Sequence, residues 1–139
     1  MLFGRWFRLN RYQYENTRQY LRLPAAWPIK CQPQEVAGGQ YVTRTKDVSA
    51  GGVAIDLPEM VPAGSHLNLE IHVPSLNRVI AVKGQVVRCI PGRHGGFALG
   101  VRFTEINEQD RKDLNEAVQR FSSAADRARQ RKFWWRRIT

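Results

Sequence analysis

A short stretch of the chain holds the residue types that could bind a ligand: a carboxylate, a hydroxyl and two adjacent glycines, at Asp47, Ser49, Gly51 and Gly52. It lies between two runs, residues 40–46 and 52–57, that are rich in β-branched and aromatic residues, as strands are. Binding residues are common on loops held by a rigid scaffold, so the stretch reads as a ligand-binding turn. A purely structural turn is the alternative, because Asp and Ser also bond nearby backbone groups and Gly allows positive φ.

A second polar segment lies upstream, where Arg18 and Arg22 are four residues apart and precede a proline-punctuated entry into a strand-like run. An Arg-x-x-x-Arg pair alone carries little weight in a chain with 22 basic residues. In combination with the later Asp-x-Ser-x-x-Gly, however, it resembles the PilZ domain, a bacterial receptor module for cyclic di-GMP. The resemblance extends to a closing strand at residues 97–103 and a helix-like run at 110–121, and so covers roughly residues 18–121.

The resemblance implies a ligand site made of five residues: Arg18, Arg22, Asp47, Ser49 and Gly52. Cyclic di-GMP presents two phosphates and two guanines, and a guanidinium can meet phosphate oxygens or a guanine O6/N7 edge with a bidentate fork. An ionised Asp47 can accept hydrogen bonds from the guanine N1–H and N2–H₂ groups, and Ser49 can serve phosphate or base. Gly52, with Gly51 before it, would let the ligand approach the backbone and would allow dihedrals closed to other residues.

Further contacts are open. Many family members carry a second arginine directly before the Arg-x-x-x-Arg element, where this chain has Thr17, so one or two ligand molecules per chain remain alternatives. Arg11 or Arg8 could substitute, and Arg102 on the closing strand could also reach the ligand. In the family, ligand binding reorders the arginine segment, which implies a change of conformation and a signal to a protein partner that the sequence does not identify.

The elements that must position these residues are strands. Six strand-like runs with turn residues between them, and no helix among them, predict a small antiparallel β-barrel: residues 28–33, 40–46, 52–57, 66–73, 78–90 and 97–103. The fold is therefore predicted to be mainly β, a six-stranded PilZ-like barrel with a C-terminal α-helix packed against it. Asn107 is a suitable cap for this helix, and residues 114, 118, 121 and 125 share one face at helical spacing.

The chain of 139 residues is long enough for one domain. We divide it into a basic aromatic extension (1–17), the barrel domain with its helix (18–121) and a basic tail with Trp134 and Trp135 (122–139). No apolar run reaches the roughly 20 residues of a membrane span, and no signal peptide is evident, so we expect a cytoplasmic protein. Cys31 and Cys89 are isolated within strand-like runs and are expected to be buried free thiols.

The net charge of +10 is concentrated at the ends of the chain. Residues 31–110 carry seven basic and eight acidic residues, whereas residues 111–139 carry nine basic and three acidic ones. A balanced middle is not typical of a duplex-binding domain, and we expect no nucleic-acid partner. A basic tail with adjacent tryptophans could instead contact an anionic membrane peripherally.

Three other functions are alternatives to a cyclic di-GMP receptor. An enzyme is not expected, because the histidines (His66, His72 and His94) are scattered and no group of residues has the spacing of metal ligands, so neither a catalytic nor a metal site is predicted. A small barrel that binds single-stranded nucleic acid through its basic ends is one alternative. The other is a PilZ-like adaptor that binds protein without nucleotide, against which the intact motif residues argue.

Overall fold

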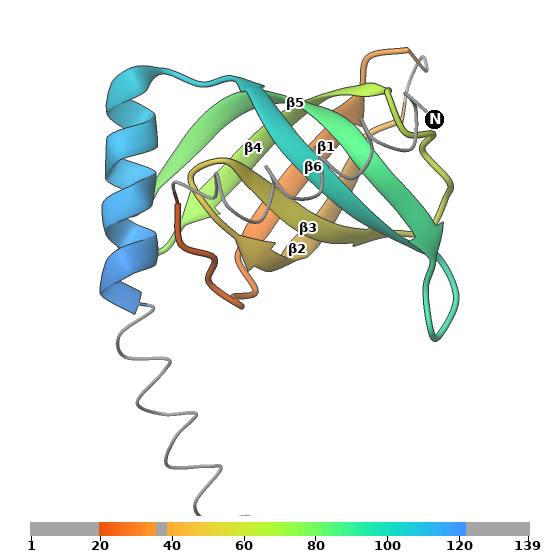
Figure 1. The fold of residues 1–139 in the computed structure, drawn as a ribbon, viewed down its shortest axis with the longest axis horizontal. Helices are drawn as coiled ribbons and strands as arrows, with labels where there is room; N and C mark the ends of the chain where they lie inside the picture. Colours follow the sequence, from red (N-terminus) through yellow and green to blue (C-terminus); the bar gives the residue numbers. More distant parts are fainter. Residues whose placement is uncertain (1–19, 36–38, 122–139) are drawn as a thin grey trace, which may run out of the picture.

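The structure, a computed structural model, describes residues 20–35 and 39–121. Its strands are β1 (Pro28–Pro33), β2 (Tyr41–Val48), β3 (Gly52–Leu57), β4 (His66–Val73), β5 (Arg78–Pro91) and β6 (Phe97–Glu105). They form a closed barrel in the order β1-β2-β3-β6-β5-β4, and every neighbouring pair is antiparallel. A helix at residues 108–121 stands against one side of the barrel (Figure 1). The predicted six-stranded antiparallel barrel with a C-terminal helix is confirmed.

The core lies inside the barrel, and the alternation of β4 shows why. Leu67, Leu69, Ile71 and Val73 are each at most 1% exposed, while the polar residues between them face outward. Successive side chains of a strand point to opposite faces, so the alternating sequence buries one face and leaves the other to solvent. Burial of this kind contributes roughly 1.5 to 3 kcal/mol for each large aliphatic side chain, which makes the interior the main source of stability.

The helix begins as the sequence predicts. The Oδ1 atom of Asn107 accepts hydrogen bonds from the backbone N–H groups of Gln109 (2.9 Å) and Asp110 (3.3 Å), the arrangement of an N-terminal cap. Leu114 and Val118 are fully buried, as expected. The prediction is wrong for Phe121, which is 40% exposed, because helical spacing sets a side chain's direction and not how far the surface beneath it extends. Residue 125 lies outside the described residues.

One arginine joins the helix to the barrel. Arg78, at the start of β5, places Nη1 2.9 Å from Asp110 Oδ1 and Nη2 2.7 Å from Asp113 Oδ2. Bonding to these two carboxylates raises the pKa of Arg78, since both favour its charged form. The forked guanidinium thus links two successive turns of the helix to one strand, beside the apolar contact of Leu114.

Several predicted limits move outward by one or two residues. β2 continues through Asp47 and Val48, so Asp47 belongs to the strand and not to the turn that follows it. β5 extends to Pro91, and its register with β6 shifts between Lys83 and Gly84. These extensions arise because pairing with a neighbouring strand, which a local pattern does not reveal, prolongs a strand past its β-rich run.

The two cysteines differ in burial. Cys31 is fully buried, and removal from water raises the pKa of its thiol to about 11. Cys89 is half-buried, which corrects the expectation that both thiols are buried, and both are free. Within the described residues no helix is long and apolar enough to cross a bilayer. The extension 1–17 and the tail 122–139 lie outside those residues.

Candidate functional site

The turn between β2 and β3 is closed by its own serine. Ser49 Oγ accepts hydrogen bonds from the backbone N–H groups of Gly51 and Gly52, each at 3.1 Å, and donates to the Gly52 carbonyl at 3.3 Å. The Ser49 backbone N–H also donates to that carbonyl, at 2.9 Å. The residue is 8% exposed. The hydroxyl is therefore occupied in shaping the turn, as short polar side chains often are.

Gly52 is required by the close approach of β6. A Cβ atom at this position would lie 2.3 Å from the carbonyl oxygen of Val101, which is backbone of the neighbouring strand. Positive φ among the described glycines occurs at Gly64, Gly95 and Gly96, and not in this turn. The expectation that the turn glycines supply unusual dihedrals is thus wrong, because strand packing and not backbone conformation demands a residue without a side chain.

Gly51 meets an aromatic ring from the arginine segment. A Cβ atom on Gly51 would lie 3.4 Å from Cδ2 of Tyr20, and the Gly51 carbonyl accepts a hydrogen bond from the N–H of Phe103 at 2.9 Å. Tyr20 is not among the site residues predicted from the sequence. The feature of the sequence that could have indicated a role for Tyr20 is its position between the two arginines of the motif, from which its ring can pack against the surface that this segment contacts.

The arginine segment is bonded to the end of β2. Leu23 and Val48 form an isolated antiparallel bridge, with Leu23 N to Val48 O at 2.7 Å and Val48 N to Leu23 O at 2.9 Å. Figure 1 shows the first described residues, in red, passing beside the turn between β2 and β3. This bridge brings Arg22 close to Asp47, and Arg22 Nη1 lies 3.5 Å from Asp47 Oδ2. Two residues that are 25 positions apart in sequence thereby face each other.

The second carboxylate oxygen of Asp47 has no partner in the described structure. Asp47 Oδ1 is buried and accepts no hydrogen bond there, although the side chain as a whole is 28% exposed. The strand register shifts between Thr45 and Asp47, and such a bulge redirects a side chain. A sheltered acceptor without a donor costs free energy, so this oxygen favours an incoming N–H group.

The remaining predicted site residues are not brought together in this way. Arg102 is the Cα partner of Gly52 on β6, but its Nη2 atom donates to Gln85 Oε1 on β5, at 3.1 Å, on the opposite side of β6 from the turn. Arg18 and Arg11 lie outside the described residues, as do Arg8 and Thr17. The geometry therefore assembles Arg22 and Asp47 next to the Ser49–Gly52 turn.

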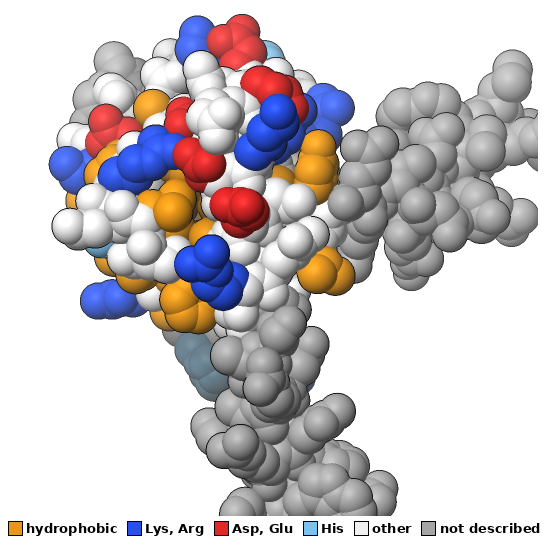
Figure 2. Space-filling view, turned by 90° about the vertical axis from the view of Figure 1, so that its left-hand side faces the viewer, with side chains coloured by type: hydrophobic (Ala, Val, Ile, Leu, Met, Phe, Trp, Pro, Cys, Tyr) orange, Lys and Arg blue, Asp and Glu red, His pale blue; other side chains and the backbone are white. Residues whose placement is uncertain are grey.

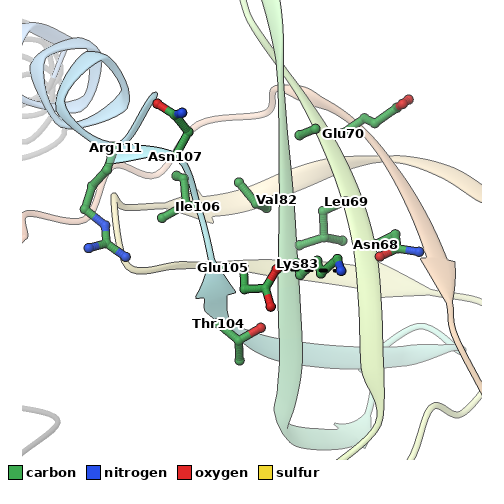
Figure 3. A pocket seen from close by; sticks show the side chains of 11 residues that line it. Asn68, Leu69, Glu70, Val82, Lys83, Thr104, Glu105, Ile106, Asn107 and Arg111 are labelled. Carbon is green, nitrogen blue, oxygen red and sulfur yellow. Dashed lines mark ion pairs between the residues drawn. The ribbon is translucent and has the colours of Figure 1, made fainter. Parts of the chain in front are cut away.

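A hollow of about 720 Å³ lies elsewhere, between β4, β5, the end of β6 and the start of the helix. Figure 3 shows Lys83 and Glu105 at its side, where Nζ and Oε2 are 3.6 Å apart, with Asn107 and Arg111 toward the helix. It contains none of the predicted site residues. Across the described ranges, no three His, Cys, Asp or Glu side chains are grouped to hold a metal ion.

Charges on the barrel are mixed. The face in Figure 2 carries basic and acidic side chains interspersed with apolar ones, and no basic stripe crosses it. Exposed ion pairs of the barrel include Lys46 with Asp56 at 3.3 Å and the Lys83–Glu105 pair. Exposed pairs of this kind contribute little to stability, and a mixture of both signs gives no strong field of one sign.

Comparisons with known proteins point to one family. A family model described as the PilZ domain matches residues 16–120. Among solved structures, the inhibitor of motility MotI/DgrA of Bacillus subtilis is similar, with a TM-score of 0.68 and 25% identity over 77% of this chain and 52% of that one. The chain therefore spans about half the length of the Bacillus subtilis protein.

Two further structures share the fold. One is the PilZ domain of YcgR from Escherichia coli with c-di-GMP, with a TM-score of 0.55 and 20% identity over 78% of this chain and 97% of that one. The other is the c-di-GMP complex of MrkH from K. pneumonia, with a TM-score of 0.63 and 15% identity over 80% of this chain and 55% of that one. A search of curated proteins gave no match to this chain.

Proposed function

Since the chain belongs to the PilZ domain family, we propose that it is a receptor for cyclic di-GMP and that the ligand binds between the arginine segment and the turn after β2. The observation that carries the proposal is the state of Asp47. Among the residues that the structure describes, none donates to one of its oxygens, which is buried, and the other faces Arg22 at 3.5 Å. A ligand that offers both N–H donors and anionic or O6/N7 acceptors would satisfy both residues.

A guanine and its phosphate have this composition. The N1–H and N2–H₂ groups of the base can donate to Asp47, while phosphate oxygens or the O6/N7 edge can accept from Arg22. The existing contact between the two residues is long for a charge-assisted hydrogen bond, which is usually 2.7 to 2.9 Å. Giving it up for ligand contacts therefore costs little, because a partly exposed pair of this geometry contributes little.

The other motif residues take different roles in this proposal. Ser49 and Gly52 hold the shape of the turn, since the serine hydroxyl is bonded within it and the glycine faces the β6 backbone. Arg18 is proposed as the second arginine of the site, on the strength of the motif. Arg11 and Arg102 are proposed for additional contacts, with one or two ligand molecules per chain as the alternatives.

Occupancy of this site would be passed on through the segment that carries Arg22. Because that segment is the N-terminal entry to β1 and already lies on the turn, ligand contacts that shift its position there would also move residues 1–17, and these could meet a protein partner. We propose a receptor without catalytic activity that works in the cytoplasm. Peripheral membrane contact through the basic tail is a prediction that falls outside the described residues.

Isothermal titration of the full chain with cyclic di-GMP tests the proposal, with GTP and a short single-stranded oligonucleotide at moderate salt as controls. Saturable binding of cyclic di-GMP, with neither control binding, is the expected result. No heat with cyclic di-GMP would overturn the receptor assignment. Binding of the oligonucleotide alone would favour a protein that binds nucleic acid. Absence of binding to cyclic di-GMP, GTP and the oligonucleotide would favour an adaptor that recognises protein.

A further inference from the structure

Tyr20 and Leu23 hold the arginine segment against the turn at two points. The Leu23–Val48 bridge fixes one end through two backbone hydrogen bonds of 2.7 and 2.9 Å. At the other end, the ring of Tyr20 packs against Gly51: a Cβ atom added to Gly51 would lie 3.4 Å from Cδ2 of Tyr20 and 4.0 Å from its Cε2. The segment therefore runs antiparallel to the end of β2 and the turn, with residue 20 facing residue 51 and residue 23 facing residue 48.

Arg22 lies between these two points, and its position depends on both. A single bridge at Leu23 leaves the preceding backbone able to rotate about its soft dihedrals, whereas a second contact three residues away restricts where the arginine side chain begins. Tyr20 also lies two residues after Arg18 in the sequence. Its contact with the turn is therefore placed between the two arginines of the motif.

We propose that Tyr20 is a positioning residue of the ligand site: its ring packs on Gly51 and holds the arginine segment in the place from which Arg22 reaches Asp47 and the ligand. This inference rests on the proposed function. The ring holds the segment ready before the ligand arrives, so less conformational freedom is lost on binding. The tyrosine hydroxyl has no part in this role, so phenylalanine at the same position should replace it.

Gly51 is the complementary half of the contact. Its φ is not positive, so the backbone there does not exclude a side chain on that ground. Among the described residues, the atoms nearest to a Cβ at this position would be those of the Tyr20 ring and Ser49 Oγ, the latter at 3.8 Å. Alanine should fit, since 3.4 Å is an ordinary contact. The two methyl groups of valine extend beyond Cβ, so Gly51→Val should displace the Tyr20 ring from its contact with residue 51.

Affinities of a set of full-length variants test the inference. Tyr20→Phe should bind cyclic di-GMP within about twofold of the wild type, whereas Tyr20→Ala should bind about three- to tenfold more weakly, the range expected for one aromatic contact. Gly51→Val should weaken binding to a similar degree. Because both changes break the same contact, the double variant should be no weaker than the weaker single variant. Full additivity of the two losses would overturn the inference.

A measurement without ligand separates positioning from the receptor assignment. Hydrogen exchange of the Leu23 and Val48 amides, which bond each other's carbonyls, should be faster in Tyr20→Ala than in Tyr20→Phe, while amides of β4 should exchange equally in both. Equal exchange of these amides in the two variants would contradict the positioning role of the Tyr20 ring. Failure of the wild type to bind would overturn the proposed function, whereas normal binding by both the wild type and Tyr20→Ala would overturn the role of Tyr20 alone.

Discussion

Replacing Gly52 with alanine should destabilise the barrel even when no ligand is present. The new Cβ atom would lie 2.3 Å from the Val101 carbonyl oxygen, and real Cβ contacts are essentially never shorter than 3.0 Å. The carbonyl must therefore move by about 0.7 Å, the difference between these two distances. The Cβ position is fixed by the backbone of β3, and the oxygen belongs to the backbone of β6, so no flexible side chain can absorb the shift.

The cost follows from what this movement disturbs. Separating β3 from β6 strains the Gly52–Arg102 pair and the hydrogen bond of 2.9 Å from Phe103 N–H to the Gly51 carbonyl. Overpacking typically costs about 1 to 3 kcal/mol, and one weakened backbone hydrogen bond adds about 1 kcal/mol. A loss of roughly 2 to 4 kcal/mol is a large part of the stability of an ordinary domain, though it should still leave the chain folded.

Urea unfolding followed by far-UV circular dichroism, without ligand, measures this loss. Gly51→Ala is the matched control, because its Cβ atom would meet only ordinary contacts and should change stability by less than about 0.5 kcal/mol. If Gly52→Ala proved as stable as the wild type, the strand-packing account of this glycine would be refuted. Weak ligand binding by a destabilised Gly52 variant would then not by itself place Gly52 in contact with ligand.

Three further predictions concern other parts of the fold. Arg78→Ala removes the ion pairs to Asp110 and Asp113 and should loosen the helix. The amides of residues 114–118 should then exchange hydrogen faster than in the control variant Lys83→Ala. Equal exchange in the two variants would contradict the role of Arg78 in holding the helix to the barrel. Glu35 Oε1 lies 2.9 Å from Nδ1 of His66 and accepts the His66 backbone N–H at 3.0 Å, and these bonds lower the pKa of the Glu35 carboxyl. The contribution of Glu35 to stability is therefore present above the usual value of 4.5 and is lost as pH falls through the lower folded value. Carboxyl NMR titration should show the lowered midpoint, and a normal midpoint would contradict the prediction. At pH 8 and in the folded state, iodoacetamide should modify Cys89 well before Cys31, whose buried thiol has its pKa raised to about 11; equal rates by mass spectrometry would refute this.

The barrel could be predicted because its signals are local. Period-two alternation in residues 66–73 states which face is buried, and prolines and glycines mark where strands end. The cap at Asn107 is equally local, since one side chain bonds the next residues of its own helix. The exposure of Phe121 could not be predicted in the same way, because it depends on the extent of the packed surface and not on helical period.

The candidate site was less accessible to prediction, since its geometry depends on contacts between distant segments. The motifs name Arg22 and Asp47, but the bridge that brings them together joins Leu23 to Val48, two apolar residues with no distinguishing pattern. The reason for Gly52 lies in a carbonyl of β6, nearly fifty residues later in the chain. A sequence pattern can name such residues, yet only the packed strands show which neighbour constrains each one.

The most direct test of the central claim is the affinity of Arg22→Ala for cyclic di-GMP, measured by isothermal titration beside the wild type and Arg44→Ala. Arg44 is a suitable control because it is an exposed arginine on β2 whose Nη1 atom donates to the Ala26 carbonyl. Hydrogen bonds to charged groups contribute roughly 1.5 to 3 kcal/mol each, so loss of one should weaken binding by about 10- to 150-fold. Arg44→Ala should bind as the wild type does. Equal affinity of all three proteins would contradict the placement of the ligand between Arg22 and Asp47.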